Sequence, residues 1–405
     1  MSFRSCIAVC GYTSIYNMPN SSWLFLRSSL VTDHHSSSSS STSTSYHHHY
    51  HFSVFFFISG ISSEKHRQIH ILPLLLIMAL PLHQLPIIML GLCFSVTMLS
   101  SHSEAKPLQV GFYSETCPDA ESIVRNVVTH AVSSDPNMAP VLLRLHYHDC
   151  IVEGCDGSIL IENGKKSEKN AFGHQGVRGF DVIERAKSEL EATCPGVVSC
   201  ADIVALAARD AVSLANGPSY RVATGRRDGL VSDIALADDM PDVSDSIFQL
   251  KAKFRNKGLS DKDLVLLSAA HTIGTTACFF MTRRLYNFMP GGGADPSISP
   301  RFLPVLTSRC PRDGNVNVRL AMDEGSEREF DKHILENIRR GFAVLASDAR
   351  LGDDENTRSV VNSYFDPTSA SSFEADFVDS IVKMGHIGVK TGSLGKIRRK
   401  CSSFN

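Results

Sequence analysis

The most informative sixteen residues of this chain read Leu143-Arg144-Leu145-His146-Tyr147-His148-Asp149-Cys150-Ile151-Val152-Glu153-Gly154-Cys155-Asp156-Gly157-Ser158. Arg144 and His148 are four residues apart, so on a helix they lie on one face. A cation beside a titratable imidazole can help to move a proton and to stabilise a developing negative charge. Taken singly, each residue also fits a plain structural role, such as a surface arginine or a core histidine. Their combination in one short segment favours a catalytic site.

The second half of the same segment offers a place for a cation. Asp149, Asp156 and Ser158 supply oxygen ligands of the kind that calcium prefers, spread over a turn that contains glycine. Cys150 and Cys155 lie close enough in sequence to close this turn with a disulfide. For each carboxylate taken alone, a solvated surface acid is the simpler alternative.

Helical periodicity predominates after residue 106, and sustained strand alternation is scarce. Ser260 followed by Asp263 is a capping pattern that predicts a helix start, and Asn216-Gly217-Pro218 predicts a helix end. We therefore predict a mostly α fold of about ten helices. The clearest segments are 119–133, 137–150, 180–192, 199–215, 244–257, 260–270, 275–287, 330–340 and 372–384, of which 199–215 is apolar enough to be buried.

Residues 1–105 differ in composition from the rest of the chain. They hold ten of the 17 histidines and the only tryptophan, Trp23, together with a serine tract. Because low complexity of this kind does not build a packed core, we interpret residues 1–77 as an extension or a gene-model artefact. Met78 opens an apolar stretch that ends in small residues, which predicts a secretory signal peptide over 78–105. If it stayed uncleaved, this stretch would act as a membrane anchor.

The remaining part, residues 106–405, is long enough for one large domain. The whole chain has a net charge of −2, which argues against nucleic acid or an anionic membrane as the main partner. This part contains eight cysteines, an even number that behind a signal sequence indicates disulfides. Spacing alone settles only the pair Cys150–Cys155. A zinc site is disfavoured, because no paired short cysteine spacing is followed by histidines at zinc-site spacing.

Four motifs, in this order and spacing, resemble the class III secretory plant peroxidases over roughly residues 107–401. Leu143–Ser158 is similar to the family's distal haem segment, and Leu267-Ser268-Ala269-Ala270-His271-Thr272-Ile273-Gly274 to its proximal haem-ligand motif. Val198-Ser199-Cys200-Ala201-Asp202-Ile203 and Gly225-Arg226-Arg227-Asp228 also match. The resemblance implies two helical lobes, distal and proximal, that enclose one haem b. It also implies three more disulfides, Cys117–Cys194, Cys200–Cys401 and Cys278–Cys310.

The resemblance also implies roles for residues around the haem. His271 would bind the iron, with Asp348 as the partner that polarises its other nitrogen. On the opposite side, His148 would take a proton from hydrogen peroxide and deliver it to the outer oxygen, while Arg144 stabilises the charge on the departing oxygen. The remaining positions are Tyr147, Ile273 and Met322, which would line the haem, and Pro241, which would line the site of an aromatic donor.

Two calcium ions are implied in the same way. The distal ion would bind Asp149, Val152, Gly154, Asp156 and Ser158, with Glu168 contributing through water. The proximal ion would bind Thr272, Asp323, Ser326, Glu329 and Asp331.

The chain departs from the family pattern at several positions. Tyr147 stands where phenylalanine is usual, and Tyr220 stands where tryptophan is usual. The asparagine that orients the catalytic histidine in the family is missing, and His174 or Gln175 falls in its place. Either side chain could accept the same hydrogen bond.

As a whole, the resemblance implies a secreted peroxidase that reduces hydrogen peroxide while oxidising small phenolic donors by one-electron steps. We expect an extracellular rather than vacuolar protein that acts as a monomer and has no stable membrane association. The altered distal residues leave one alternative from another class. In that alternative the chain is a catalytically weakened calcium-binding, disulfide-stapled protein that serves as a binding module.

Overall fold

The computed structural model describes residues 27–30, 50–53 and 107–404. The chain forms two compact units, Met1–Ser101 and His102–Asn405. In the first unit, strands β1 (Arg27–Leu30) and β2 (Tyr50–Ser53) pair in antiparallel fashion. The rest of the predicted N-terminal extension and the whole predicted signal peptide lie outside the described residues.

The second unit is mostly helical, as predicted. The described residues contain twelve α-helices, ten of which have seven residues or more. They are α3 (Ala120–Ser134), α4 (Met138–Ile151), α5 (Phe180–Thr193), α6 (Cys200–Leu214), α7 (Ile247–Asn256), α8 (Asp261–Ser268), α9 (Thr282–Tyr286), α10 (Leu303–Arg309), α11 (His333–Arg339), α12 (Ala346–Arg350), α13 (Glu355–Ser363) and α14 (Phe373–Met384). None of these helices combines the length and the apolar character that a membrane span requires.

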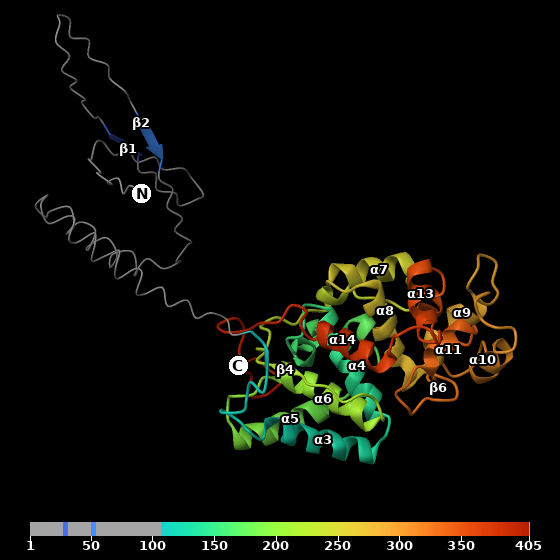
Figure 1. Ribbon diagram of the computed structural model, residues 1–405, viewed down its shortest axis with the longest axis horizontal. Helices are drawn as coiled ribbons and strands as arrows, with labels where there is room; N and C mark the ends of the chain where they lie inside the picture. Colours follow the sequence, from blue (N-terminus) through green and yellow to red (C-terminus); the bar gives the residue numbers. More distant parts are fainter. Residues whose placement is uncertain (1–26, 31–49, 54–106, 405) are drawn as a thin grey trace, which may run out of the picture. The chain divides into compact units, whose positions relative to one another are not determined.

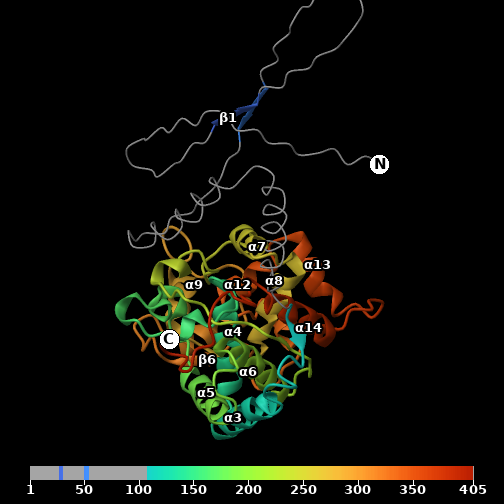
Figure 2. The same ribbon diagram turned by 90° about the vertical axis from the view of Figure 1, so that its left-hand side faces the viewer.

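Two groups of helices give the unit its two lobes. In the first lobe α6 packs against α3, α4 and α5, and in the second lobe α8 packs against α7, α13 and α14. In both views, α3 and α5 lie at the end of the unit opposite to α7 and α13 (Figures 1 and 2). As its apolar sequence predicts, α6 is central, with every residue from Cys200 to Val212 buried. It ends at Leu214, two residues before Asn216, which is the one non-glycine residue with a positive φ (61°) among those described.

The predicted helix over 275–287 is wrong in its first half. Thr275–Ala277 form strand β5, which pairs antiparallel with β6 (Arg319–Ala321). A short 3₁₀ turn follows, and only Thr282–Tyr286 are α-helical. The β-branched threonines at the start of this segment fit a paired strand, so tertiary pairing overrides the helical pattern.

Two of the sequence motifs interlock at the start of α6. The carboxylate of Asp202 accepts hydrogen bonds from the Gly225 and Arg226 backbone nitrogens at 2.7 and 3.1 Å, and from the Arg226 guanidinium at 2.8 Å. Asp228 in turn accepts from the backbone nitrogen of Ala201 at 2.9 Å. These contacts are buried, so the motifs have a structural role that fixes α6 against the following loop.

All four predicted disulfides are present. Cys150–Cys155 closes the turn after α4, and Cys200–Cys401 joins α6 to the C-terminal segment. The other two are Cys117–Cys194 and Cys278–Cys310. The predicted cap is also confirmed. The Ser260 hydroxyl accepts from Asp263 N, and the Asp263 carboxylate accepts from Ser260 N at 2.7 Å.

Candidate active site

Helix α4 presents Arg144 and His148 to one short loop. Nδ1 of His148 lies 2.8 Å from Nδ1 of His174, and the Arg144 guanidinium donates to the Gln175 carbonyl oxygen at 3.0 Å. The Tyr147 ring meets the His148 ring edge-on, with 5.6 Å between centroids. Of the two candidates for the missing asparagine, His174 therefore meets His148 through its side chain, and Gln175 is used through its backbone.

The two contacting histidines are neutral bases in this setting. Burial lowers the pKa of His148 well below its usual range, and the nearby Arg144, His174 and His271 lower it further. Burial and Arg144 together lower the pKa of His174 to about 4. Burial, followed by the charge of Arg319, also lowers the pKa of Arg144 to about 10. An uncharged His148 beside a charged Arg144 can accept a proton while the arginine stabilises an anion.

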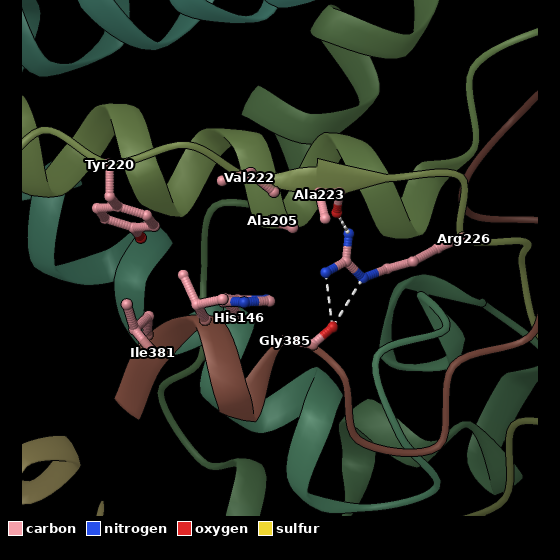
Figure 3. A pocket seen from close by; sticks show the side chains of 9 residues that line it. His146, Ala205, Tyr220, Val222, Ala223, Arg226, Ile381 and Gly385 are labelled. Carbon is pink, nitrogen blue, oxygen red and sulfur yellow. Dashed lines mark hydrogen bonds between the residues drawn. The ribbon is translucent and has the colours of Figure 1, made fainter. Parts of the chain in front are cut away.

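His146 faces a different side of α4 from His148. It lies in a pocket with Tyr220, Ile381 and the Arg226–Gly385 contact (Figure 3). It is 3% exposed, and burial and Arg226 lower its pKa to about 3. Two residues along a helix rotate a side chain to another face, which separates His146 from His148.

In the second lobe, His271 is held by Asp348. Nδ1 of His271 is 3.0 Å from each carboxylate oxygen of Asp348, which is 1% exposed on α12. Burial lowers the pKa of His271, but the charge and hydrogen bond of Asp348 outweigh it, so the net shift is upward. Arg144 also influences this pKa, which indicates that His271 and the α4 residues share one electrostatic environment. The other ring nitrogen, Nε2, is left for a further partner.

The start of α4 meets the segment after His271 directly. Gly274 has a φ of +98°, and a Cβ atom there would lie 2.7 Å from Pro140 Cβ, so only glycine fits. The Gly274 carbonyl accepts from Met322 N at 3.1 Å, beside the β5–β6 pairing. Ile273 is 2% exposed. Of the predicted haem-lining residues, Ile273 lies two positions after His271 in the chain, Met322 contacts Gly274, and the Tyr147 ring contacts that of His148.

Several of the predicted distal cation ligands have buried oxygens without a hydrogen bond. Asp149 Oδ1, Ser158 Oγ and both carboxylate oxygens of Glu168 are buried without a hydrogen bond. Asp149 Oδ2 accepts from Gly157 N at 3.0 Å, which fixes the turn. Lysines reach two other predicted ligands, since Lys257 donates to Val152 O and Lys390 pairs with Asp156. Gly154 packs against the backbone of residues 387–388.

The predicted proximal ligands converge on one hydroxyl group. Thr272 Oγ1 lies 3.0 Å from Asp323 Oδ2, 3.3 Å from Glu329 O and 3.2 Å from Asp331 Oδ1. Ser326 Oγ donates to Asp331 Oδ2 at 2.7 Å. One hydroxyl proton cannot serve three acceptors, so this arrangement of oxygens suits a cation.

Each cation site needs oxygens other than carboxylates. Among the described residues, no three His, Cys, Asp or Glu side chains already form a group that could hold a metal. Both predicted sets include serine or threonine hydroxyls and backbone carbonyls, which are ordinary calcium ligands.

An aromatic cluster at the surface was not found from the sequence. Phe172 and Phe279 are 63% and 43% exposed and have ring centroids 6.4 Å apart, and Phe280 lies 5.2 Å from Phe279. Met240 packs on the backbone of Gly173, so Pro241 is connected to the same loop as Phe172. Exposed aromatic clusters commonly bind ligands. The adjacent pair Phe279-Phe280 was the only sequence signal.

Comparisons with known proteins agree with this geometry. Residues 124–366 match the family model described as "Peroxidase". The chain is 68% identical over 301 residues to "Peroxidase 43" of Arabidopsis thaliana, which covers 74% of this chain and 92% of that protein. It is 55% identical over 325 residues to "Peroxidase 13" of Arabidopsis thaliana (78% and 100%). It is 48% identical over 320 residues to "Peroxidase N1" of Nicotiana tabacum (78% and 96%).

Proposed function

The chain belongs to the class III plant peroxidases, and we propose that it reduces hydrogen peroxide while oxidising small phenolic donors by one-electron steps. The family implies haem, and the residues present fit one haem b. His271 is held by Asp348 through Nδ1, with Nε2 free for the iron, and Tyr147, Ile273 and Met322 supply the lining. When bound, haem supplies the iron that cleaves peroxide and stores its oxidising equivalents.

The observation that carries the proposal is a pair of histidines, one in each lobe, each held through Nδ1. His148 is held by His174 at 2.8 Å, and His271 is held by Asp348 at 3.0 Å. His148 accepts a proton from peroxide at Nε2 and returns it to the outer oxygen, and Arg144 stabilises the negative charge that develops. Asp348 keeps the proton of His271 on Nδ1 and makes Nε2 a stronger ligand.

Guaiacol oxidation tests the proposal. The purified, calcium-loaded protein with haem should oxidise guaiacol in the presence of hydrogen peroxide and not in its absence. A protein that folds with its disulfides and binds calcium, yet neither takes up haem nor oxidises guaiacol, would instead be the binding module.

Two calcium ions complete the proposed site. The orphan oxygens of Asp149, Ser158 and Glu168 support the distal ion, and the oxygens around Thr272 support the proximal one. Because Thr272 directly follows His271, the proximal ion also steadies the proposed iron ligand. The four disulfides support an oxidising compartment, and we propose that the mature protein starts after residue 105 and acts outside the cell as a monomer.

Removal of calcium should destabilise the protein more at pH 8 than at pH 5. Without the ion, burial and Asp156 raise the pKa of Asp149 well above its usual range, and burial raises the pKa of Glu168 to about 8. The folded state then holds protons that the unfolded chain releases near pH 4, so calcium-free stability falls as pH rises from about 4 to 8. Calcium replaces those protons.

The measurement is the difference in Tm with and without calcium at the two pH values. Acids elsewhere in the molecule titrate in both calcium states. Their effect on Tm therefore cancels when the two states are compared at the same pH. An equal loss of Tm at both pH values would contradict a calcium site built on Asp149 and Glu168.

We propose that the aromatic donor binds beside Pro241, against the cluster of Phe172, Phe279 and Phe280. Phe172→Ala should raise the guaiacol KM roughly two- to tenfold, because an aromatic pair contributes about 0.5–1.5 kcal/mol. The reaction rate with hydrogen peroxide should change less. Phe248 on α7 is 79% exposed and outside the cluster, so Phe248→Ala is the matched control. Equal KM values in both variants would exclude the cluster as the donor site.

A further inference from the structure

Helix α12, which carries Asp348, is too short to hold its own position. It has five residues, and no side chain caps its first turn. Helices of this length are unstable by themselves, so their position depends on tertiary contacts. Asp348 nevertheless has both carboxylate oxygens 3.0 Å from Nδ1 of His271. The contacts that hold α12 therefore decide how well Asp348 can polarise the proposed iron ligand.

A buried guanidinium holds the start of α12. Arg284, which lies on α9 and is 2% exposed, donates to the carbonyl oxygens of residues 343–345, directly before the helix. Its Nε atom donates to Oδ2 of Asp295 at 3.0 Å. The backbone joins the same two residues, since Asp295 N donates to Arg284 O at 2.8 Å. Arg284 and Asp295 therefore act as one support for the start of the helix.

The end of α12 returns to the same carboxylate. Arg350, the last residue of the helix, donates from Nη2 to both oxygens of Asp295, at 3.3 and 3.0 Å. Ser297 Oγ accepts from the same nitrogen at 3.0 Å and from Arg284 Nη2 at 3.2 Å. Asp295 is 2% exposed, so it pairs with two arginines away from solvent. The segment 295–297 therefore holds both ends of α12.

The buried charges around α12 balance. Arg284 and the arginine of α12 supply two positive charges, and Asp295 and Asp348 supply two negative ones. A further acid, Asp353, contacts the arginine of α12 from the surface, where water screens its charge. Burial lowers the pKa of Arg284, and the charge of Asp295 and, to a smaller degree, that of Asp348 oppose this fall. Asp348 is therefore within reach of a cation that competes with His271 for its charge.

We propose that Asp295 is a positioning residue of the proposed peroxidase site. By pairing with Arg284 and Arg350, it keeps both guanidiniums away from Asp348. The Asp348 carboxylate is then left to His271. The inference rests on the proposed function, in which a strong hydrogen bond from Nδ1 of His271 makes Nε2 a better ligand. Stability alone does not explain the cluster, because replacing buried ion pairs by apolar side chains is often neutral or stabilising.

Asp295→Asn tests this role on the calcium-loaded protein with haem. The amide keeps the size of the side chain and removes its charge, so the guanidiniums are left to turn toward Asp348 and weaken its hydrogen bond to His271. The readout is the iron–histidine stretching band in the resonance Raman spectrum of the ferrous protein, which reports the strength of that hydrogen bond without turnover. Asp348→Asn, which lacks the carboxylate, defines the fully weakened position of the band.

The band of Asp295→Asn should move to lower frequency, at least about half of the way to that of Asp348→Asn, and the rate with hydrogen peroxide should fall about tenfold. Ser297→Ala is the matched control, because it removes an acceptor of the same two guanidiniums and leaves every charge in place. This control should lower Tm and keep the band at the wild-type position.

Two results would overturn the proposal while the peroxidase activity stands. One is a band at the wild-type position in Asp295→Asn, and the other is an equal shift of the band in Ser297→Ala. A wild-type protein that takes up haem but shows no iron–histidine band would overturn the proposed function itself, and this inference with it.

A second pair of variants decides the question if Asp295→Asn does not fold with two unpaired arginines. Arg350→Gln removes one cation and leaves Asp295 paired with Arg284, so its band should stay near the wild-type position. Asp295→Asn in the Arg350→Gln background leaves Arg284 as one buried cation within reach of Asp348, so the band should again move to lower frequency. Identical bands in Arg350→Gln and the double variant would contradict the proposal.

Discussion

His148→Ala is expected to lower the rate of reaction with hydrogen peroxide about a thousandfold, within the range that a positioned general base contributes. His148 is buried, neutral and held through Nδ1, so its Nε2 is the proposed acceptor of the peroxide proton. The measurement is the second-order rate constant of the Soret change on mixing with peroxide. Haem uptake should be retained, because His271 remains.

His146→Ala is the matched control, since both histidines are buried on α4, at 3% and 5% exposure. It removes a side chain of the same size from the same helix but faces the pocket with Tyr220 and Arg226. This variant should lose thermal stability, because the substitution leaves a cavity that the surrounding structure fills only in part. Its rate with peroxide should stay within about threefold of the wild type, because the lost side chain faces away from His148. A similar loss of peroxide rate in both variants would contradict the assignment of His148 as the base.

Arg144→Leu is expected to lower the same rate roughly a hundredfold, the usual effect of removing one donor to a developing anion. The guanidinium is held by the Gln175 carbonyl at 3.0 Å, and the charge is retained despite burial. Loss of this charge should also raise the pKa of His148, which the arginine lowers.

Arg144→Lys separates charge from shape. Lysine retains the positive charge but lacks the planar guanidinium group. That group can donate to the Gln175 carbonyl with one nitrogen while another nitrogen points into the site. Its rate should fall between those of the wild type and Arg144→Leu. If the leucine variant reacted with peroxide as fast as the wild type, Arg144 would have no part in stabilising the departing oxygen.

The sequence predicted the fold class, the four disulfides and most long helices, since these depend on local periodicity and on the family motifs. It did not predict α10, α12 and α13, because helices of seven, five and nine residues are too short to show a repeated apolar pattern. The sequence also predicted a helix at Thr275–Ala277, which is wrong. These residues form a strand because they pair with residues 319–321, more than forty positions away along the chain.

Residues of the candidate site that belong to local motifs were predicted, and contacts between distant parts of the chain were not. His148 and His271 belong to local motifs, and Asp348 was identified through the family although it is 77 residues from its partner. The choice between His174 and Gln175 depends on how the loop folds back on α4, and only the structure resolves it. The contact between Phe172 and Phe279 joins residues more than one hundred positions apart in the chain, so neither local sequence gives any sign of it.

The visible absorption spectrum of the calcium-loaded, disulfide-intact protein tests the central claim most directly. The account predicts a Soret band after reconstitution with hemin, and its loss or a clear shift in His271→Ala, because that side chain is the proposed iron ligand. A Soret band identical in the wild type and His271→Ala would contradict the ligand assignment. A wild-type protein that remains colourless with hemin would contradict the haem site itself.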